Sequence, residues 1–128
     1  MLKIVLGFLV AVAIAGSLPA GGVIWSHGKL LRSEPAPDST VKTAPRVVRA
    51  WFNDELDAKR STISVTDARG RRVDDGKGGV DLQDMDRKSM IARLKPAAPG
   101  SYTVTWKAVS VDDGFVAKGS YRFKIAPK

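Results

Sequence analysis

The sequence predicts an all-β domain, a Greek-key sandwich or barrel of about seven strands. Apolar and polar residues alternate in short runs with no sustained helical periodicity, as in strands buried on one face. Clusters of turn-forming residues separate these runs at 35–38, 67–70, 75–79, 96–100 and 112–114. Short strands at this spacing are typical of sandwiches and barrels.

The amino-terminal segment has the layout of a secretory signal peptide. Lys3 is followed by an apolar run over residues 4–18 and then by small or turn-favouring residues. The run is shorter than the roughly 20 residues that a membrane-spanning helix needs. We therefore predict cleavage, with a retained membrane anchor as the alternative.

Two cleavage points fit this layout, after Ala20 and after Ser26. We favour Ser26, which gives a signal peptide over residues 1–26 and one compact domain over residues 27–128. His27 then becomes the first residue of the mature chain.

The predicted strands place apolar side chains on one face each. The alternating sets are Val48, Ala50 and Phe52; Ile63 and Val65; Met90, Ala92 and Leu94; Tyr102, Val104, Trp106 and Ala108; and Tyr121, Phe123 and Ile125. The last two sets predict the central strand pair of the core. The stretch 73–88, rich in Gly and Asp, predicts a long loop with a short strand around 80–82.

Composition excludes several function classes. The chain has no cysteine, so thiolate catalysis, redox pairs and cysteine zinc sites are excluded. The net charge is +8, and +7 after removal of Lys3 with the leader. Because the cations are scattered and do not alternate with aromatic residues, we interpret them as a solvated basic surface and not as a nucleic-acid platform.

The only histidine of the chain is His27. A free α-amine and the imidazole of the same residue can chelate one metal ion, and nitrogen donors completed by carboxylate or water suit Cu(II). The amine must first lose its proton, from a pKa of about 7.7–8, so binding weakens in acid. Spacing alone does not establish such a site, because a lone terminal histidine is ordinarily a solvated side chain.

Three segments, in order along almost the whole mature chain, resemble CopC-type copper-binding domains. They are 27–39 (HGKLLRSEPAPDS), 48–54 (VRAWFND) and 100–123 with its Tyr-Thr-Val-Thr-Trp strand and Asp-Asp-Gly turn. The resemblance implies an immunoglobulin-like or cupredoxin-like Greek-key fold and a periplasmic location. It also implies Cu(II) held by an amino-terminal His and by the Asp and His of an Asp-x-His motif between the last two strands.

Carried onto this chain, the resemblance makes His27 and Asp113 the metal ligands. The second histidine position is occupied by Phe115, so the implied copper site is weaker than in the family. Asp112 is an alternative oxygen donor, and Asp54 is placed to hydrogen-bond the amine or ring from outside the ligand set. The competing interpretation of the Asp-Asp-Gly segment is an ordinary turn capped by Asp.

Other chemistry finds little support in the sequence. Met85 and Met90 do not form the cluster that a Cu(I) site would need, and we expect ordinary packing. The acidic pairs Asp74-Asp75 and Asp84-Asp86 are expected in solvated turns. No catalytic constellation is visible, so we predict that the protein is not an enzyme.

Two hypotheses follow. The first is a monomeric periplasmic protein of copper homeostasis or resistance, with Cu(II) as cargo and an inner-membrane copper transport protein as a partner. The second is a CopC-like domain that has lost metal binding and acts as an interaction module in the envelope through its basic face.

Overall fold

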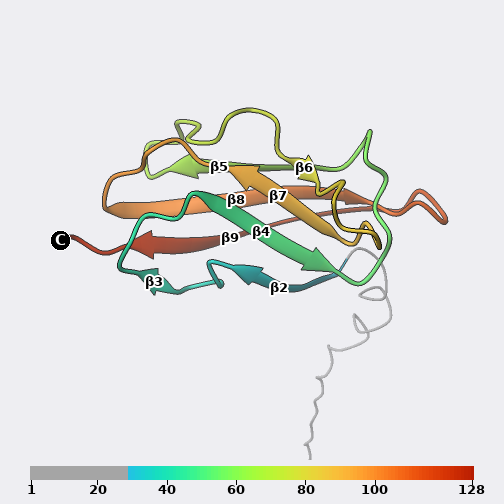
Figure 1. Cartoon of the computed structure of the whole chain (residues 1–128), viewed down its shortest axis with the longest axis horizontal. Helices are drawn as coiled ribbons and strands as arrows, with labels where there is room; N and C mark the ends of the chain where they lie inside the picture. Colours follow the sequence, from blue (N-terminus) through green and yellow to red (C-terminus); the bar gives the residue numbers. More distant parts are fainter. Residues whose placement is uncertain (1–28) are drawn as a thin grey trace, which may run out of the picture.

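The computed structural model of the chain describes residues 29–128, which form two facing β-sheets (Figure 1). The predicted signal peptide and His27 lie outside these residues. The described part contains the following strands: β2 (Leu30–Glu34), β3 (Thr40–Val41), β4 (Val47–Phe52), β5 (Thr62–Asp67), β6 (Gly79–Val80), β7 (Ser89–Arg93), β8 (Gly100–Val109) and β9 (Val116–Ile125).

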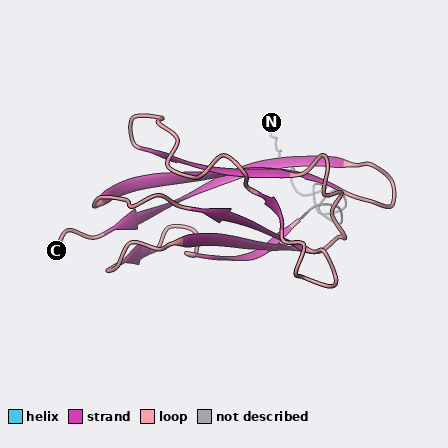
Figure 2. Ribbon diagram, turned by 45° about the horizontal axis from the view of Figure 1, so that its top comes forward, coloured by secondary structure: helices cyan, strands magenta, loops and turns pink. Residues whose placement is uncertain are grey.

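The strands are arranged in two sheets of four. One sheet has the order β2-β4-β7-β6 and the other the order β3-β9-β8-β5. All pairs are antiparallel except the short parallel pair of β3 and β9. From β2 to β6 each strand lies in the opposite sheet to the strand before it, and the chain crosses once more between β7 and β8. The two layers are visible in Figure 2. The all-β prediction is confirmed, as a sandwich with one strand more than expected.

The core consists of the alternating apolar faces that the sequence predicts. Val48 and Ala50 of β4 are fully buried and Phe52 is 1% exposed, while the intervening residues are only partly covered. The long hairpin of β8 and β9 supplies the facing layer, where Tyr102 and Phe123 stack with ring centroids 5.5 Å apart. Removal of these faces from water is the main stabilising contribution to the fold.

Gly119 allows a close contact within the β8–β9 hairpin. It lies opposite Trp106, whose indole occupies the space that a Cβ at this position would need. Trp106 also packs edge-on against Phe52 of the other sheet, at a centroid distance of 5.9 Å. Glycine is therefore required here by packing, because any side chain would displace the indole.

The short strand expected around 80–82 in the 73–88 stretch is present, but it covers Gly79–Val80. Leu82 lies beyond the pairing of β6 with β7 and is 64% exposed. One other expectation for this stretch is wrong. Asp74 is not in a solvated turn: its side chain is buried and accepts a hydrogen bond from the Val65 amide at the edge of β5.

Within residues 29–128 no helix has the length and apolar character needed to cross a membrane.

Candidate metal centre

The turn between β8 and β9 carries Asp113. The Ser110 amide donates to the Phe115 carbonyl at 3.0 Å, and the Gly114 amide donates to the Ser110 carbonyl at 2.9 Å. Gly114 has a φ of +71°, a conformation that glycine adopts without steric cost. The Asp113 Oδ1 atom accepts a hydrogen bond of 3.0 Å from the Phe115 amide. Asp113 therefore caps its own turn, and this bond orients its carboxylate.

The segment that follows β4 runs beside this turn. The Val111 amide donates to the Glu55 carbonyl at 3.0 Å, and the Asp57 amide donates to the Val109 carbonyl at 2.8 Å. Leu56 forms a bridge with Ser110 between these two bonds and is 1% exposed. Backbone pairing and a buried leucine thus fix the base of the turn against the 53–57 segment.

The same segment holds the first described residue of the chain. The Lys29 amide donates to the Asn53 side-chain oxygen at 2.8 Å, and the Asn53 amide donates to the Lys29 carbonyl at 3.0 Å. Asn53 and Glu55 are two residues apart, a separation of at most about 7 Å. The start of the described chain and the Asp113 turn consequently lie at the same end of the sandwich (Figure 1).

A cation also lies close to the turn. The Nη2 atom of Arg60 would be 3.9 Å from a Cβ on Gly114, and the Arg60 Nε atom is paired with Asp57 at 3.0 Å. The Lys59 amide and the Arg60 side chain hold the pKa of Asp57 below its usual value. Asp57 therefore stays ionised and keeps the guanidinium beside the turn, where its charge opposes the approach of a metal cation.

The remaining sequence candidates have different surroundings. Asp54 lies between Asn53 and Glu55, and Asp112 is exposed in the same turn as Asp113, so both are at this end of the molecule. Met90 is fully buried whereas Met85 is 95% exposed, so the expected packing holds for Met90 only.

Phe115, at the position of the second histidine, is 41% exposed, and the neighbouring Val111 and Val116 are exposed by 47% and 48%. His27 lies outside the described residues. Within residues 29–128, no group of three or more His, Asp or Glu side chains is close enough together to hold a metal ion.

Sequence reasoning did not identify Asn53 or Arg60 as parts of this region. Asn53 hydrogen-bonds Lys29, which is 24 positions earlier in the sequence. Arg60 lies beside Gly114, although more than 50 residues separate them in the sequence. Neither contact has a local sequence signal, because the first continues the pairing of β2 with β4 and the second joins the segment after β4 to the β8–β9 turn.

Comparisons with known proteins place these features in context. The sequence model of the CopC domain matches residues 30–126. Copper resistance protein C of Xanthomonas campestris pv. juglandis is 30% identical over 118 residues, which cover 89% of this chain and 91% of that protein. Protein YobA of Escherichia coli (strain K12) is 29% identical over 103 residues, which cover 80% of this chain and 81% of YobA. Copper transport protein CutJ of Bacillus subtilis (strain 168) is 30% identical over 102 residues, which are 79% of this chain but 18% of CutJ.

Solved structures give the same pattern. CopC from Methylosinus trichosporium OB3b superposes with a TM-score of 0.70 at 27% identity, covering 79% of this chain and 95% of that one. PcoC, a methionine-rich copper resistance protein from Escherichia coli, superposes with a TM-score of 0.65 at 30% identity. The superposition covers 77% of this chain and 98% of PcoC.

Proposed function

The chain belongs to the CopC domain family, and on that premise we propose that it is a periplasmic copper-homeostasis protein that holds Cu(II) through His27 and Asp113. A copper-related role is supported by the names of its relatives, which include a copper resistance protein and a copper transport protein. The ligand assignment rests on the family resemblance and on the geometry of the β8–β9 turn.

The observation that carries the proposal is the shared support of Lys29 and the Asp113 turn. Asn53 binds Lys29 through two hydrogen bonds, and Glu55 binds Val111 at the base of the turn. His27 precedes Lys29 by two residues, a span of at most about 7 Å. The amine and imidazole of a mature chain beginning at His27 would therefore lie at the same end of the sandwich as the Asp113 carboxylate, the placement that a shared metal site requires.

The proposed site combines two nitrogens with one oxygen. The α-amine and the ring of His27 supply the nitrogens, Asp113 supplies the oxygen, and water completes the coordination that Cu(II) favours. The bond from the Phe115 amide to Oδ1 orients the carboxylate without using all of its lone pairs.

Export and processing are part of the same proposal. Removal of residues 1–26 creates the amine, and with those residues attached the same nitrogen would be an amide that cannot coordinate as an amine. The copper would be bound without catalysis by a monomeric domain and passed to an inner-membrane copper transport protein.

Titration of Cu(II) into matched forms of the protein tests the proposal. The form that begins at His27 should bind one equivalent, whereas a form that begins at Gly21 should bind at least about tenfold more weakly. Asp113→Asn should weaken binding by about tenfold, while the matched variant Asp112→Asn should change it by less than about twofold. Equal affinities for all four proteins would contradict the assignment.

The second candidate function is an interaction module without copper. The replacement of the expected histidine by Phe115 favours it, and so does the exposed apolar surface of Val111, Phe115 and Val116 around the turn. The same titration separates the two functions, because a module that has lost its metal would show no difference between the starts at His27 and Gly21.

A further inference from the structure

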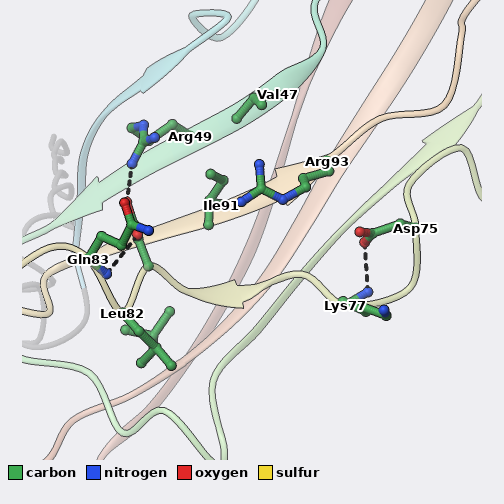
Figure 3. A pocket seen from close by; sticks show the side chains of 10 residues that line it. Val47, Arg49, Asp75, Lys77, Leu82, Gln83, Ile91 and Arg93 are labelled. Atoms are coloured by element: carbon green, nitrogen blue, oxygen red, sulfur yellow. Dashed lines mark hydrogen bonds and ion pairs between the residues drawn. The ribbon is translucent and has the colours of Figure 1, made fainter.

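A trough crosses the outer face of the β2-β4-β7-β6 sheet. It consists of two adjoining depressions that share Val47 and Arg93. The first, here named the sheet hollow, has a volume of about 460 Å³ and lies over β4, β7 and the segment after β6 (Figure 3). The second, the end hollow, has a volume of about 670 Å³ and lies between the turn before β4 and the loop after β7.

The end hollow is cationic. Arg46, Arg93 and Lys95 line it, all three are exposed, and no acidic residue contributes to its wall. None of the three side chains forms an ion pair with another residue of the described chain. Pro45 and Pro96 supply rigid apolar surface between the charges. This combination suits a ligand that carries carboxylates on an apolar frame.

Backbone pairing fixes the spacing of these cations. The Leu94 amide donates to the Arg46 carbonyl at 2.9 Å, and Arg93 lies opposite Val47 in the pairing of β4 with β7. The Lys95 amide donates to the Val73 carbonyl, also at 2.9 Å. The cations are therefore attached to a rigid scaffold, which lowers the entropy lost when a partner binds.

The sheet hollow differs in character from the end hollow. Arg49 is already paired with Asp81, the Arg93 guanidinium points toward Ile91, and the Asp75 carboxylate accepts a hydrogen bond from the Lys77 amide (Figure 3). Ile91 and the exposed Leu82 provide apolar contact surface beside these groups. The trough thus changes from purely cationic at the end hollow to mixed charge at the sheet hollow, where Asp75 and Asp81 partly balance the cations and Ile91 and Leu82 add apolar surface.

We propose that this trough docks an extended acidic segment of a partner polypeptide. Its carboxylates would meet the cations of the end hollow, and an adjoining apolar side chain would cover Ile91 and Leu82. A concave surface of this kind favours an inserted chain over a planar lipid bilayer, and a small anion would leave the apolar surface uncovered.

The end hollow, which carries the three cations, is remote from the proposed copper site. Val47 begins β4 and Arg93 ends β7 at one end of the sandwich, whereas the β8–β9 turn lies at the other (Figure 1). Docking is therefore independent of the proposed copper function, and a copper-free chain would still bind its partner.

Fluorescence anisotropy with a labelled eight-residue peptide of alternating Glu and Val tests the proposal. The triple variant Arg46→Glu, Arg93→Glu and Lys95→Glu should weaken binding by more than about tenfold. The control triple Lys118→Glu, Arg122→Glu and Lys124→Glu makes the same charge change at exposed positions of β9 and should stay within about twofold. The single variant Arg93→Ala, with less risk to folding, should weaken binding several-fold.

Equal losses in both triples would overturn the proposal, because they would show attraction to net charge alone. Absence of saturable binding would also overturn it, as would trough-dependent binding to anionic phospholipid vesicles without binding to the peptide. Addition of equimolar Cu(II) should leave the peptide affinity unchanged within about twofold, and a strong dependence on copper would contradict the independence of the two sites.

Discussion

Replacement of Asp74 by Ala should destabilise the protein strongly at neutral pH. The Asp74 side chain is fully buried and accepts three hydrogen bonds: from the Val65 amide at 2.7 Å, the Gly76 amide at 2.7 Å and the Arg72 Nε atom at 2.9 Å. Val65 belongs to the edge strand β5, so Asp74 satisfies an amide that no neighbouring strand reaches.

The expected loss of stability in Asp74→Ala follows from the hydrogen bond that each of the three donors loses. The buried Val65 amide would be left without a partner, which costs about 1–3 kcal/mol, whereas water can replace the partner of the exposed Gly76 amide at about 1 kcal/mol or less. The ion pair with Arg72 adds at most about 1 kcal/mol, because the Arg72 side chain is half exposed. The free energy of unfolding should fall by about 2–4 kcal/mol. For a domain of this size, each kcal/mol corresponds to a decrease of roughly 4–8 °C in the melting temperature.

The effect should also depend on pH. Burial raises the pKa of Asp74, but the hydrogen bonds from Val65, Gly76 and Arg72 outweigh burial and hold the pKa below its ordinary value of 3.8. A carboxyl group with a lowered pKa in the folded state stabilises fully above the unfolded pKa, and this contribution is lost as pH falls through the folded pKa. The stability difference between the wild type and Asp74→Asn should therefore be present at pH 7 and shrink below about pH 4.

Urea denaturation at pH 7 and pH 3 measures these differences, with Asp75→Asn as the matched control. Asp75 is the exposed neighbour of Asp74 and caps only the Lys77 amide, so its replacement should cost less than about 0.5 kcal/mol. The role assigned to Asp74 would be contradicted if Asp74→Ala were no more destabilising than the control, or if the stability deficit of Asp74→Asn were the same at both pH values.

Three further variants test other contacts. Gly119→Ala should lower the free energy of unfolding by about 1–3 kcal/mol in urea denaturation, because the added methyl group collides with the Trp106 indole. The control Ser120→Ala, on the exposed side of the strand, should change it by less than about 0.5 kcal/mol. Equal effects of the two variants would be inconsistent with the packing of Trp106 on Gly119. Phe115→His should tighten Cu(II) binding by more than about tenfold by adding an imidazole beside the proposed carboxylate ligand, and an unchanged titration would argue against the placement of the site. Arg60→Gln should tighten Cu(II) binding by about two- to fivefold at low salt, because it removes a positive charge beside the turn. The effect should disappear in 1 M salt. A weaker Cu(II) complex in the variant would mean that the guanidinium supports the site.

Much of the fold could be predicted from the sequence because the two sheets bury one face each. Alternation along β4, β8 and β9 identified the core residues, and the buried states of Phe52 and Phe123 confirm it. The bounds of the short β6 and the burial of Asp74 could not be predicted in the same way. Both depend on pairing with residues distant in the sequence, and a Gly- and Asp-rich stretch has no hydrophobic period to indicate it.

The candidate site was less predictable than the fold. His27 and Asp113 came from the family resemblance, since a lone terminal histidine and an Asp-Asp-Gly turn carry little chemical information by themselves. The link between them runs through Asn53, whose side chain bonds Lys29 where the pairing of β2 with β4 ends. That link, like the Arg60 cation beside the turn, becomes visible only when the loop after β4 and the β8–β9 turn are seen together.

The proposed copper site requires that the terminal amine and ring of His27 bind Cu(II) together with Asp113. Electron paramagnetic resonance of the equimolar Cu(II) complex, recorded for protein that begins at His27 and for the same protein acetylated at its amine, tests this claim directly. Nitrogen hyperfine structure is expected in the first sample, and its loss or marked change is expected in the second. A spectrum of hydrated Cu(II) in the first sample, or identical spectra in both, would contradict it.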